Sequence, residues 1–160
     1  MNGVDPLETK GGFLISRVKR VGSRRFDKLL ADSGVDAFNG AQGRMLYVLW
    51  QEDDVPISTL AAQTGLANTT LTSMLDRMEQ SGLVRRVPGK KDRRKVHILL
   101  TEKAKGLQED FQRISQEMNQ LYYIGFSEEE IHQFEGYLLR ILDNLEGGAD
   151  HEQSIRSRNQ

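Results

Sequence analysis

The sequence predicts a mainly α-helical fold with a small β wing, and three observations carry this prediction. Residues 57–80 place apolar side chains at helical spacing on both sides of a single glycine, which is typical of two helices joined by a tight turn. Residues 83–100 alternate apolar and polar side chains around a strongly basic loop, as in a hairpin. Residues 107–145 repeat apolar side chains in steps of three and four, as in helices that pack on other helices. This order is that of a winged helix-turn-helix domain integrated with a helical dimerisation region.

Composition limits the classes of protein that the chain can form. Its 160 residues suit one domain or two closely integrated ones, and the absence of cysteine excludes disulfides and thiolate metal sites. No apolar run approaches the ~18 residues of a membrane span, and the first residues lack an apolar signal core. We therefore expect a cytoplasmic protein with no membrane partner.

Charge is segregated along the chain although the net charge is only −1. Residues 85–105 carry nine lysines and arginines against two acids, whereas residues 106–153 carry two against eleven. A second basic cluster, with six cations against one acid, lies at residues 17–28. Because local charge decides affinity for a polyanion, the distribution favours nucleic acid as a partner.

The first third of the chain predicts two helices. We expect residues 1–12, which contain one proline and three glycines, to form a flexible arm, and residues 13–31 to form a helix with one apolar stripe. Helical spacing resumes at about residue 41, with Met45, Leu46 and Leu49 on the buried face. Three acids and a proline within residues 51–56 then end the second helix.

The next two helices form the helix-turn-helix. Ser58 is the expected N-cap of the first, and Gly65 is suited to the left-handed conformation at its end. The second is expected over residues 68–80, with Leu71 and Leu75 facing the core. Its opposite face carries short polar side chains and one arginine, which can approach base edges and phosphates. These candidate DNA contacts are Asn68, Thr69, Thr70, Thr72, Ser73 and Arg77.

Residues 83–87 and 95–100 are expected to pair as the two strands of the wing. The tip between them has five cations around one carboxylate. Asp92 is placed to hold Arg94 through a bidentate ion pair, and a narrow minor groove is a natural destination for such an arginine. The candidate DNA contacts in the wing are Lys90, Lys91, Asp92, Arg93 and Arg94.

The last third predicts two long helices, the second beginning with a capping box between Ser127 and Glu130. Their apolar seams need more partners than a chain of this length supplies, which favours a homodimer. We expect residues 13–31 and 102–146 to form the dimerisation region, residues 41–101 the DNA-binding domain and residues 147–160 a disordered tail. The predicted dimer contacts are Leu14, Phe111, Met118, Phe134, Leu138, Ile141 and Leu145.

Residues 13–145, and most specifically the segments LAAQTGLANTTLTSMLDRMEQSGLVRR and DRRKVHILLT, resemble the MarR-type transcriptional regulators. The resemblance implies a dimeric regulator of transcription, chiefly a ligand-responsive repressor, bound to a pseudo-palindromic operator in double-stranded DNA. The recognition helix enters the major groove in this family. Its wing arginine enters the minor groove, a role that falls here on Arg94 with Asp92 orienting it. Many members carry a capping serine where this chain has Ala67.

The resemblance also implies a small aromatic or lipophilic effector, with no other cofactor. Residues suited to contact it are Phe13, Arg17, Phe38, Tyr47, Trp50 and Phe111.

Three other classes of function fit the sequence less well. The three histidines are isolated and no phosphate-binding glycine loop is present, so we do not expect an enzyme. The run EEEIH at residues 128–132 leaves open a zinc-sensing regulator of the same fold, although acids suit any helix N-terminus. A winged-helix module that binds protein is also conceivable, but such a wing needs no concentrated positive charge.

Overall fold

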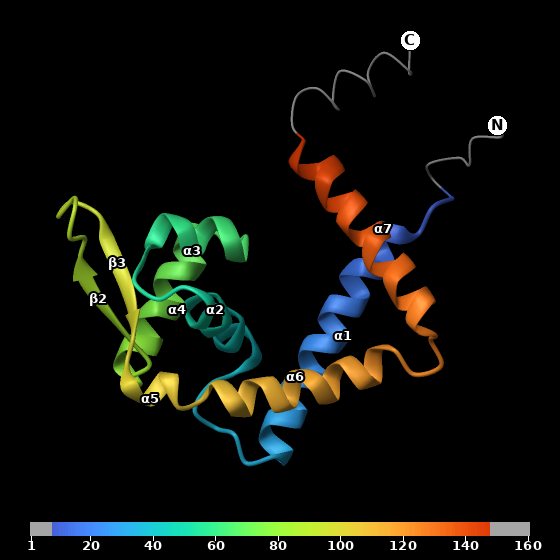
Figure 1. The fold of residues 1–160 in the computed structure, drawn as a ribbon, viewed down its shortest axis with the longest axis horizontal. Coiled ribbons are helices and arrows are strands. Elements are labelled where there is room, and N and C mark those ends of the chain that lie inside the picture. The colour runs from blue at the N-terminus through green and yellow to red at the C-terminus, as the bar shows by residue number, and fades with distance from the viewer. Residues whose placement is uncertain (1–7, 148–160) are drawn as a thin grey trace, which may run out of the picture. The chain divides into compact units, whose positions relative to one another are not determined.

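The computed structural model describes residues 8–147, so most of the expected arm at 1–12 and of the tail at 147–160 lies outside the described residues. The chain divides into two compact units, residues 1–118 and 119–160. The elements, all but β1 labelled in Figure 1, are α1 (Gly11–Asp32), α2 (Gly40–Gln51), β1 (Val55–Pro56), α3 (Ile57–Thr64), α4 (Asn68–Gln80), β2 (Val84–Pro88), β3 (Val96–Leu100), α5 (Glu102–Lys105), α6 (Gln108–Tyr122) and α7 (Glu128–Glu146). No helix among residues 8–147 is both long and apolar enough to cross a membrane.

The core of the first unit forms where α2, α3, α4 and the sheet meet. Met45, Leu46 and Leu49 of α2 are fully buried, as are Leu71 and Leu75 of α4. These residues occupy the faces that helical spacing predicted, and burying each side chain contributes about 1.5–3 kcal/mol. The predicted fold class, mainly helical with a small β wing, is confirmed.

The turn between α3 and α4 forms as the glycine predicted. Gly65 ends α3 at a φ of +67°, and its N–H donates to the carbonyl of Ala61. The prediction that Ser58 caps α3 was wrong: the helix already begins at Ile57, with Pro56 at the N-cap and no side-chain cap. The fixed φ of proline suits the entry to a helix, so the helix starts earlier than a serine cap would place it.

The wing belongs to a three-stranded antiparallel sheet with the order β1–β3–β2. Val84 pairs with Leu100 and Pro88 with Val96 in the hairpin, while β1 pairs Val55 with Ile98. The sequence predicted both hairpin strands but not β1, because a two-residue strand ending in proline has no alternating pattern to detect.

The two long helices expected in the last third are present as α6 and α7, and the short helix α5 precedes them. The hydroxyl of Thr101 caps the short α5 by accepting from the N–H of Ala104, and α6 begins only at Gln108. Thr101 also donates to the carbonyl of Gly82, over 2.6 Å, which ties the end of β3 to the turn before β2.

The second unit contains the end of α6 and all of α7. The capping box predicted at the start of α7 is present, because the Ser127 hydroxyl accepts from the Glu130 N–H at 3.1 Å while the Glu130 carboxylate accepts from the Ser127 N–H at 3.0 Å. The backbone N–H of Ser127, and then its hydroxyl, hold the pKa of Glu130 below its ordinary value. Tyr123 donates to Glu135 at 2.8 Å, which joins the segment after α6 to α7.

Candidate nucleic-acid interface

The outer face of α4 is the first part of the candidate interface. The helix spans the residues expected of it, and its apolar side is fully buried at Leu71, Leu75 and Met78. The predicted contacts all lie on the exposed side: Asn68, Thr69, Thr70, Thr72, Ser73 and Arg77. The N-cap residue Ala67 provides no side-chain hydrogen bond. The first turn of α4 therefore keeps backbone N–H groups that a phosphate can accept from.

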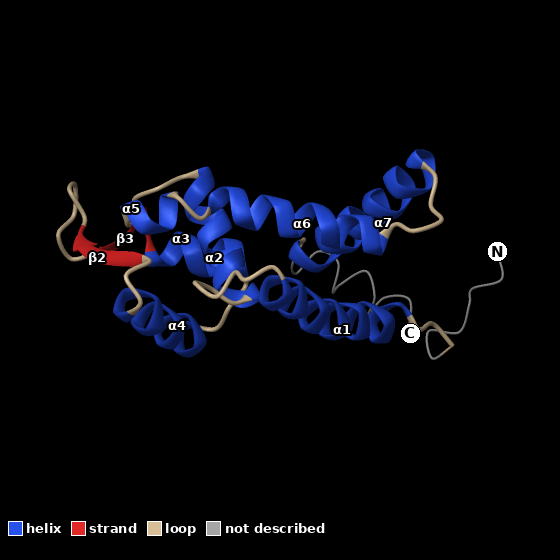
Figure 2. Ribbon diagram, turned by 90° about the horizontal axis from the view of Figure 1, so that it is seen from below, coloured by secondary structure: helices blue, strands red, loops and turns tan. Residues whose placement is uncertain are grey.

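Arg86 of β2 joins the wing to α4, which packs beside it (Figures 1 and 2). Its Nη1 lies 2.7 Å from Asp76 Oδ1, and its Nη2 donates to the Thr72 carbonyl at 3.3 Å. Its backbone N–H donates to the Glu79 carboxylate at 3.1 Å. The sequence counted Arg86 among the cations available to nucleic acid. The structure instead uses it to fix the position of the wing relative to α4.

The loop between β2 and β3, residues 89–95, projects at one end of the unit (Figure 2). Asp92 holds Arg94 there, as predicted, but not through a bidentate pair. One carboxylate oxygen, Oδ1, accepts from the Arg94 backbone N–H at 3.0 Å and lies 3.4 Å from its Nε. An aspartate side chain that accepts from the backbone N–H two residues later forms an Asx turn, in which one carboxylate oxygen accepts the hydrogen bond. The Arg94 side chain is 93% exposed, so the outer nitrogens of its guanidinium face solvent.

The remaining cations divide into two groups. Lys103 donates to the carbonyl of Ser81, and Lys105 pairs with Glu102, so both are engaged within the chain. Lys90, Lys91, Arg93 and Lys95 are exposed, and the structure gives them no ion pair within residues 8–147. Within residues 85–105, most of the exposed cations without an ion pair therefore lie in residues 89–95. Arg85 and the six cations of α1 at residues 17–28 are also exposed and have no ion pair in the described part of the chain.

Four of the six residues suggested for an effector site pack together as one aromatic cluster, namely Phe38, Tyr47, Trp50 and Phe111. Phe111 is 9% exposed. The centroid of its ring lies 5.3 Å from the centroid of the Trp50 ring and 6.1 Å from the centroid of the Phe38 ring. Phe13 is 67% exposed, and Arg17 is exposed beside it on α1. A cavity of about 420 Å³ lies nearby, and only Tyr47 of the suggested residues lines it.

The other residues around this cavity come from α1, from α2, from the end of α3 and from the turn after it. They are Lys19, Ala41, Arg44, Val48, Gln63, Thr64 and Leu66. One face of α2 carries three of them, Ala41, Arg44 and Val48, at helical spacing. This spacing can be read from the sequence, but a search for aromatic side chains does not find it.

The predicted dimer contacts also differ in their surroundings. Phe111 and Met118 are buried within the single chain. Leu138 is half-buried, whereas exposed apolar side chains remain at Leu14, Phe134, Ile141 and Leu145. No residue of α7 is buried, although the helix is strongly amphipathic.

A metal site is not assembled by the described residues. Between residues 8 and 147, no group of three histidine, aspartate or glutamate side chains is arranged to hold an ion. His132, in the run that left zinc open, is exposed on α7.

Comparison with known proteins agrees with the fold. Residues 38–96, which extend from just before α2 to the first residue of β3, match the sequence model of the MarR family. The HTH-type transcriptional regulator TtmR of Methylorubrum extorquens is 41% identical over 63 residues, which cover 39% of this chain and 32% of TtmR. The organic hydroperoxide resistance transcriptional regulator of Bacillus subtilis is 33% identical over 96 residues, which cover 60% of this chain and 63% of that protein. The chain therefore spans about one third of the first relative and just under two thirds of the second.

The solved structures include a complex with nucleic acid. The crystal structure of a mutant MarR from E. coli complexed with operator DNA matches with a TM-score of 0.74 and 26% identity, covering 82% of this chain and 92% of that one. The family and these relatives are transcriptional regulators, not enzymes. This confirms the expectation that the chain is not an enzyme.

Proposed function

Because the chain belongs to the MarR family of transcriptional regulators, we propose that it is a homodimeric, ligand-responsive repressor that binds a pseudo-palindromic operator in the cytoplasm. The observation that carries the proposal is that one compact unit presents two exposed surfaces suited to DNA. The polar face of α4 and the Arg94 side chain belong to the same unit, and Arg86 links their elements. We take α4 to be the major-groove element and the wing loop to be the minor-groove element.

The dimer is supported by apolar side chains that the single chain leaves uncovered. Leu145 is 75% exposed and Leu139 is 65% exposed on α7, and Leu14 is 50% exposed on α1. A two-fold dimer removes such side chains from water and sets two α4 helices about one turn of DNA apart. Replacing Leu138 and Ile141 together with glutamate should give monomers in light scattering. It should also weaken operator binding on the order of 100-fold, because the second half-site no longer binds intramolecularly.

The effector response is supported by the 420 Å³ cavity between α1, α2 and the helix-turn-helix. Its size suits a small molecule. Lys19 and Arg44 supply positive charge, and Tyr47 supplies an aromatic wall. A small aromatic carboxylate fits this chemistry, and it would change DNA affinity only by binding one conformation of the dimer more tightly than another.

The test of DNA binding is a salt titration on duplexes selected from a random pool. Each phosphate that a cation neutralises should add about 0.9 to the negative slope of log affinity against log salt, so a steep slope and a palindromic consensus are expected. A protein that binds no duplex at low salt, or one whose selected pool shows no two-fold sequence, contradicts the proposal.

A further inference from the structure

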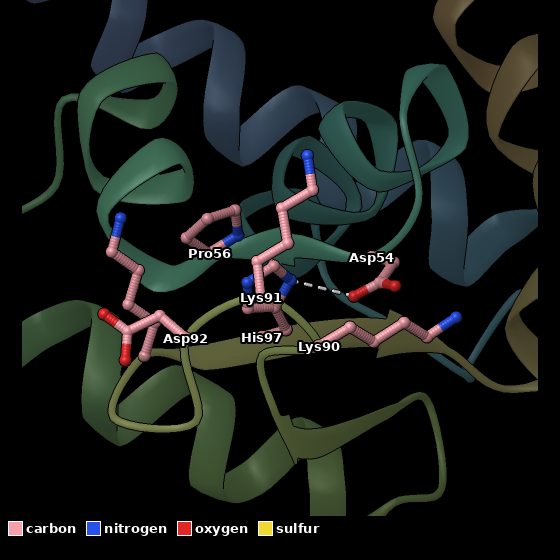
Figure 3. A pocket seen from close by; sticks show the side chains of 7 residues that line it. Asp54, Pro56, Lys90, Lys91, Asp92 and His97 are labelled. Carbon is pink, nitrogen blue, oxygen red and sulfur yellow. Dashed lines mark hydrogen bonds and ion pairs between the residues drawn. The ribbon is translucent and has the colours of Figure 1, made fainter.

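A pair formed by Asp54 and His97 lies beneath the wing, outside the surfaces assigned to DNA. The His97 Nδ1 lies 2.9 Å from Asp54 Oδ1, so a protonated Nδ1 donates to the carboxylate (Figure 3). Asp54 has a φ of +57°, the one positive value at a non-glycine residue among residues 8–147. Residues other than glycine rarely adopt a positive φ, and those that do are concentrated at functional positions.

His97 lies at the centre of the sheet. It is on β3, opposite Pro56 of β1 and Val87 of β2, and its side chain is 21% exposed. Its neighbour Ile98 is fully buried in the core. Since successive side chains of a strand point to opposite faces, the His97 ring lies on the face of the sheet away from that core.

The other ring nitrogen of His97 abuts the base of the wing loop. A methyl group on Gly89 would lie 2.9 Å from His97 Nε2 and 2.6 Å from the Asp92 carbonyl oxygen, so the backbone approaches the ring as closely as glycine allows. The imidazole thus fills the space between the loop before β1 and the loop that carries Arg94.

The wing loop is itself closed by hydrogen bonds that begin at this contact. The Gly89 N–H donates to the Lys95 carbonyl at 2.8 Å, and the Lys95 N–H donates to the Asp92 carbonyl at 3.2 Å. Asp92 then fixes Arg94 through its Oδ1. A continuous set of contacts therefore leads from Asp54 through His97 and Gly89 to the exposed guanidinium.

A cavity of about 390 Å³ surrounds the pair, with Lys90, Lys91 and Lys95 in its lining, but it is a poor site for a small anion. Figure 3 shows Lys90 and Lys91 extending in different directions. The two carboxylates in the lining are already engaged, Asp54 by His97 and Asp92 by Arg94. An anion site needs cations that converge on one point, so the arrangement favours support of the loop over binding within it.

We propose that His97, held by Asp54, is a positioning residue for DNA recognition, because its ring supports the wing loop and sets where Arg94 meets the minor groove. The inference rests on the proposed function, since it concerns how the same wing binds duplex DNA. The role belongs to this chain's own pair and needs no contact between His97 and DNA.

The test is a double-mutant cycle on the full-length protein with His97→Ala, Arg94→Ala and the double variant, measured on one selected duplex. We expect His97→Ala to weaken binding roughly 3- to 10-fold, as the loss of one supporting hydrogen bond does. Arg94→Ala should then cost clearly less in the His97→Ala protein than in the wild type. His132→Ala, at an exposed histidine of α7, serves as the matched control and should change nothing.

A second pair of variants separates the carboxylate from the backbone at position 54. Asp54→Asn keeps an oxygen acceptor and tolerates the positive φ, so it should bind DNA like the wild type. Asp54→Gly also tolerates that φ but has no acceptor, so it should resemble His97→Ala in affinity and in its coupling to Arg94. Melting temperatures of all variants identify any that fail to fold, and the Asp54 pair alone then decides the question.

The outcomes distinguish this inference from the proposed function. A wild-type protein that binds no duplex at low salt overturns both. Wild-type binding with strictly additive losses for His97 and Arg94, or equal affinities for Asp54→Asn and Asp54→Gly, overturns the positioning role and leaves the proposed function standing.

Discussion

The outer face of α4 and the wing loop differ in almost every physical property, although we assign both to the same DNA. The face of α4 carries hydroxyls, an amide and one arginine, held on a helix whose opposite side is fully buried. The wing loop carries five cations and depends on hydrogen bonds within the loop and on the contact of Gly89 with His97. The helix face is therefore suited to distinguish bases, whereas the wing is suited to supply electrostatic affinity.

From this difference we expect the two surfaces to divide the energetics of recognition between them. A face with one cation gains little from phosphate contacts, so its hydrogen bonds to base edges must select the sequence. A loop with high local charge binds any duplex, and its specificity is limited to the width of the minor groove. Arg86 ties β2 to α4, so we expect the position of α4 on DNA to fix that of the wing.

The largest effect should come from Arg94→Ala in the wing. The change should cost about 1–3 kcal/mol of binding free energy, most on duplexes with a narrow minor groove, and should lower the magnitude of the salt slope by about 0.9. Fluorescence anisotropy across a salt series measures both quantities. Arg93→Ala, at the neighbouring cation that has no ion pair in the described residues, is the matched control and should cost less. Equal losses for the two variants would mean that the Asp92 contact does not orient Arg94.

The next effect concerns the face of α4 and should be of a different kind. Thr70→Ala combined with Ser73→Ala should change the relative affinities of operator variants by about 1 kcal/mol at the bases contacted, with the salt slope unchanged. Gln80→Ala, on the same helix but outside the predicted contacts, is the control. A uniform loss over all duplexes would contradict the division between a selective helix and an electrostatic wing.

The face of α4 and the wing show which elements can be predicted from the sequence alone. The spacing of Leu71 and Leu75 predicted which face of α4 is exposed, because helical periodicity is local and repeated. The wing hairpin was predicted by alternation, but β1 was not, since Val55 and Pro56 form a strand only through pairing with β3. Long-range contacts of this kind have no local signature.

The same limit applies to individual side chains. Sequence predicted that Asp92 accompanies Arg94, a contact between residues two positions apart. It did not predict that Arg86 bonds to Asp76, or that His97 meets Asp54 across 43 positions. Nor did it predict the cavity beside Tyr47, because three separate helices contribute to it. The roles of the DNA-contacting and dimer residues remain predictions.

A smaller effect is expected where the two surfaces are joined. Arg86→Lys keeps the charge but loses the planar group that contacts both Asp76 and the Thr72 carbonyl. The free energy of unfolding should fall by about 1 kcal/mol or less, since the group is partly exposed to solvent. DNA affinity should fall a few-fold, because the wing and α4 no longer keep a fixed separation.

Urea unfolding and anisotropy together provide this measurement. The informative quantity is the coupling of Arg86→Lys with Thr70→Ala and with Arg94→Ala, each in a double variant. If Arg86 sets the separation of the surfaces, it should couple to both. Coupling to Arg94 alone would show that Arg86 acts within the wing and not between the wing and the helix.

The smallest effect should arise in the second unit, from the capping box of α7. The Ser127 N–H and hydroxyl hold the pKa of Glu130 below its ordinary value, and the group is fully exposed. A folded pKa that is lowered contributes stability above the unfolded value, 4.5, which is lost as the pH falls through the folded value. Glu130→Gln keeps a side-chain acceptor for the Ser127 N–H but removes the charge, so the part of the pH dependence of stability that Glu130 contributes should disappear. NMR titration of the Glu130 carboxyl carbon measures the shift.

Operator affinity and salt slope near neutral pH should equal those of the wild type, since the cap lies outside the unit that carries α4 and the wing. A changed salt slope would mean that residues 119–147 also contribute to the electrostatics of DNA binding, and the division of roles between α4 and the wing would then be incomplete.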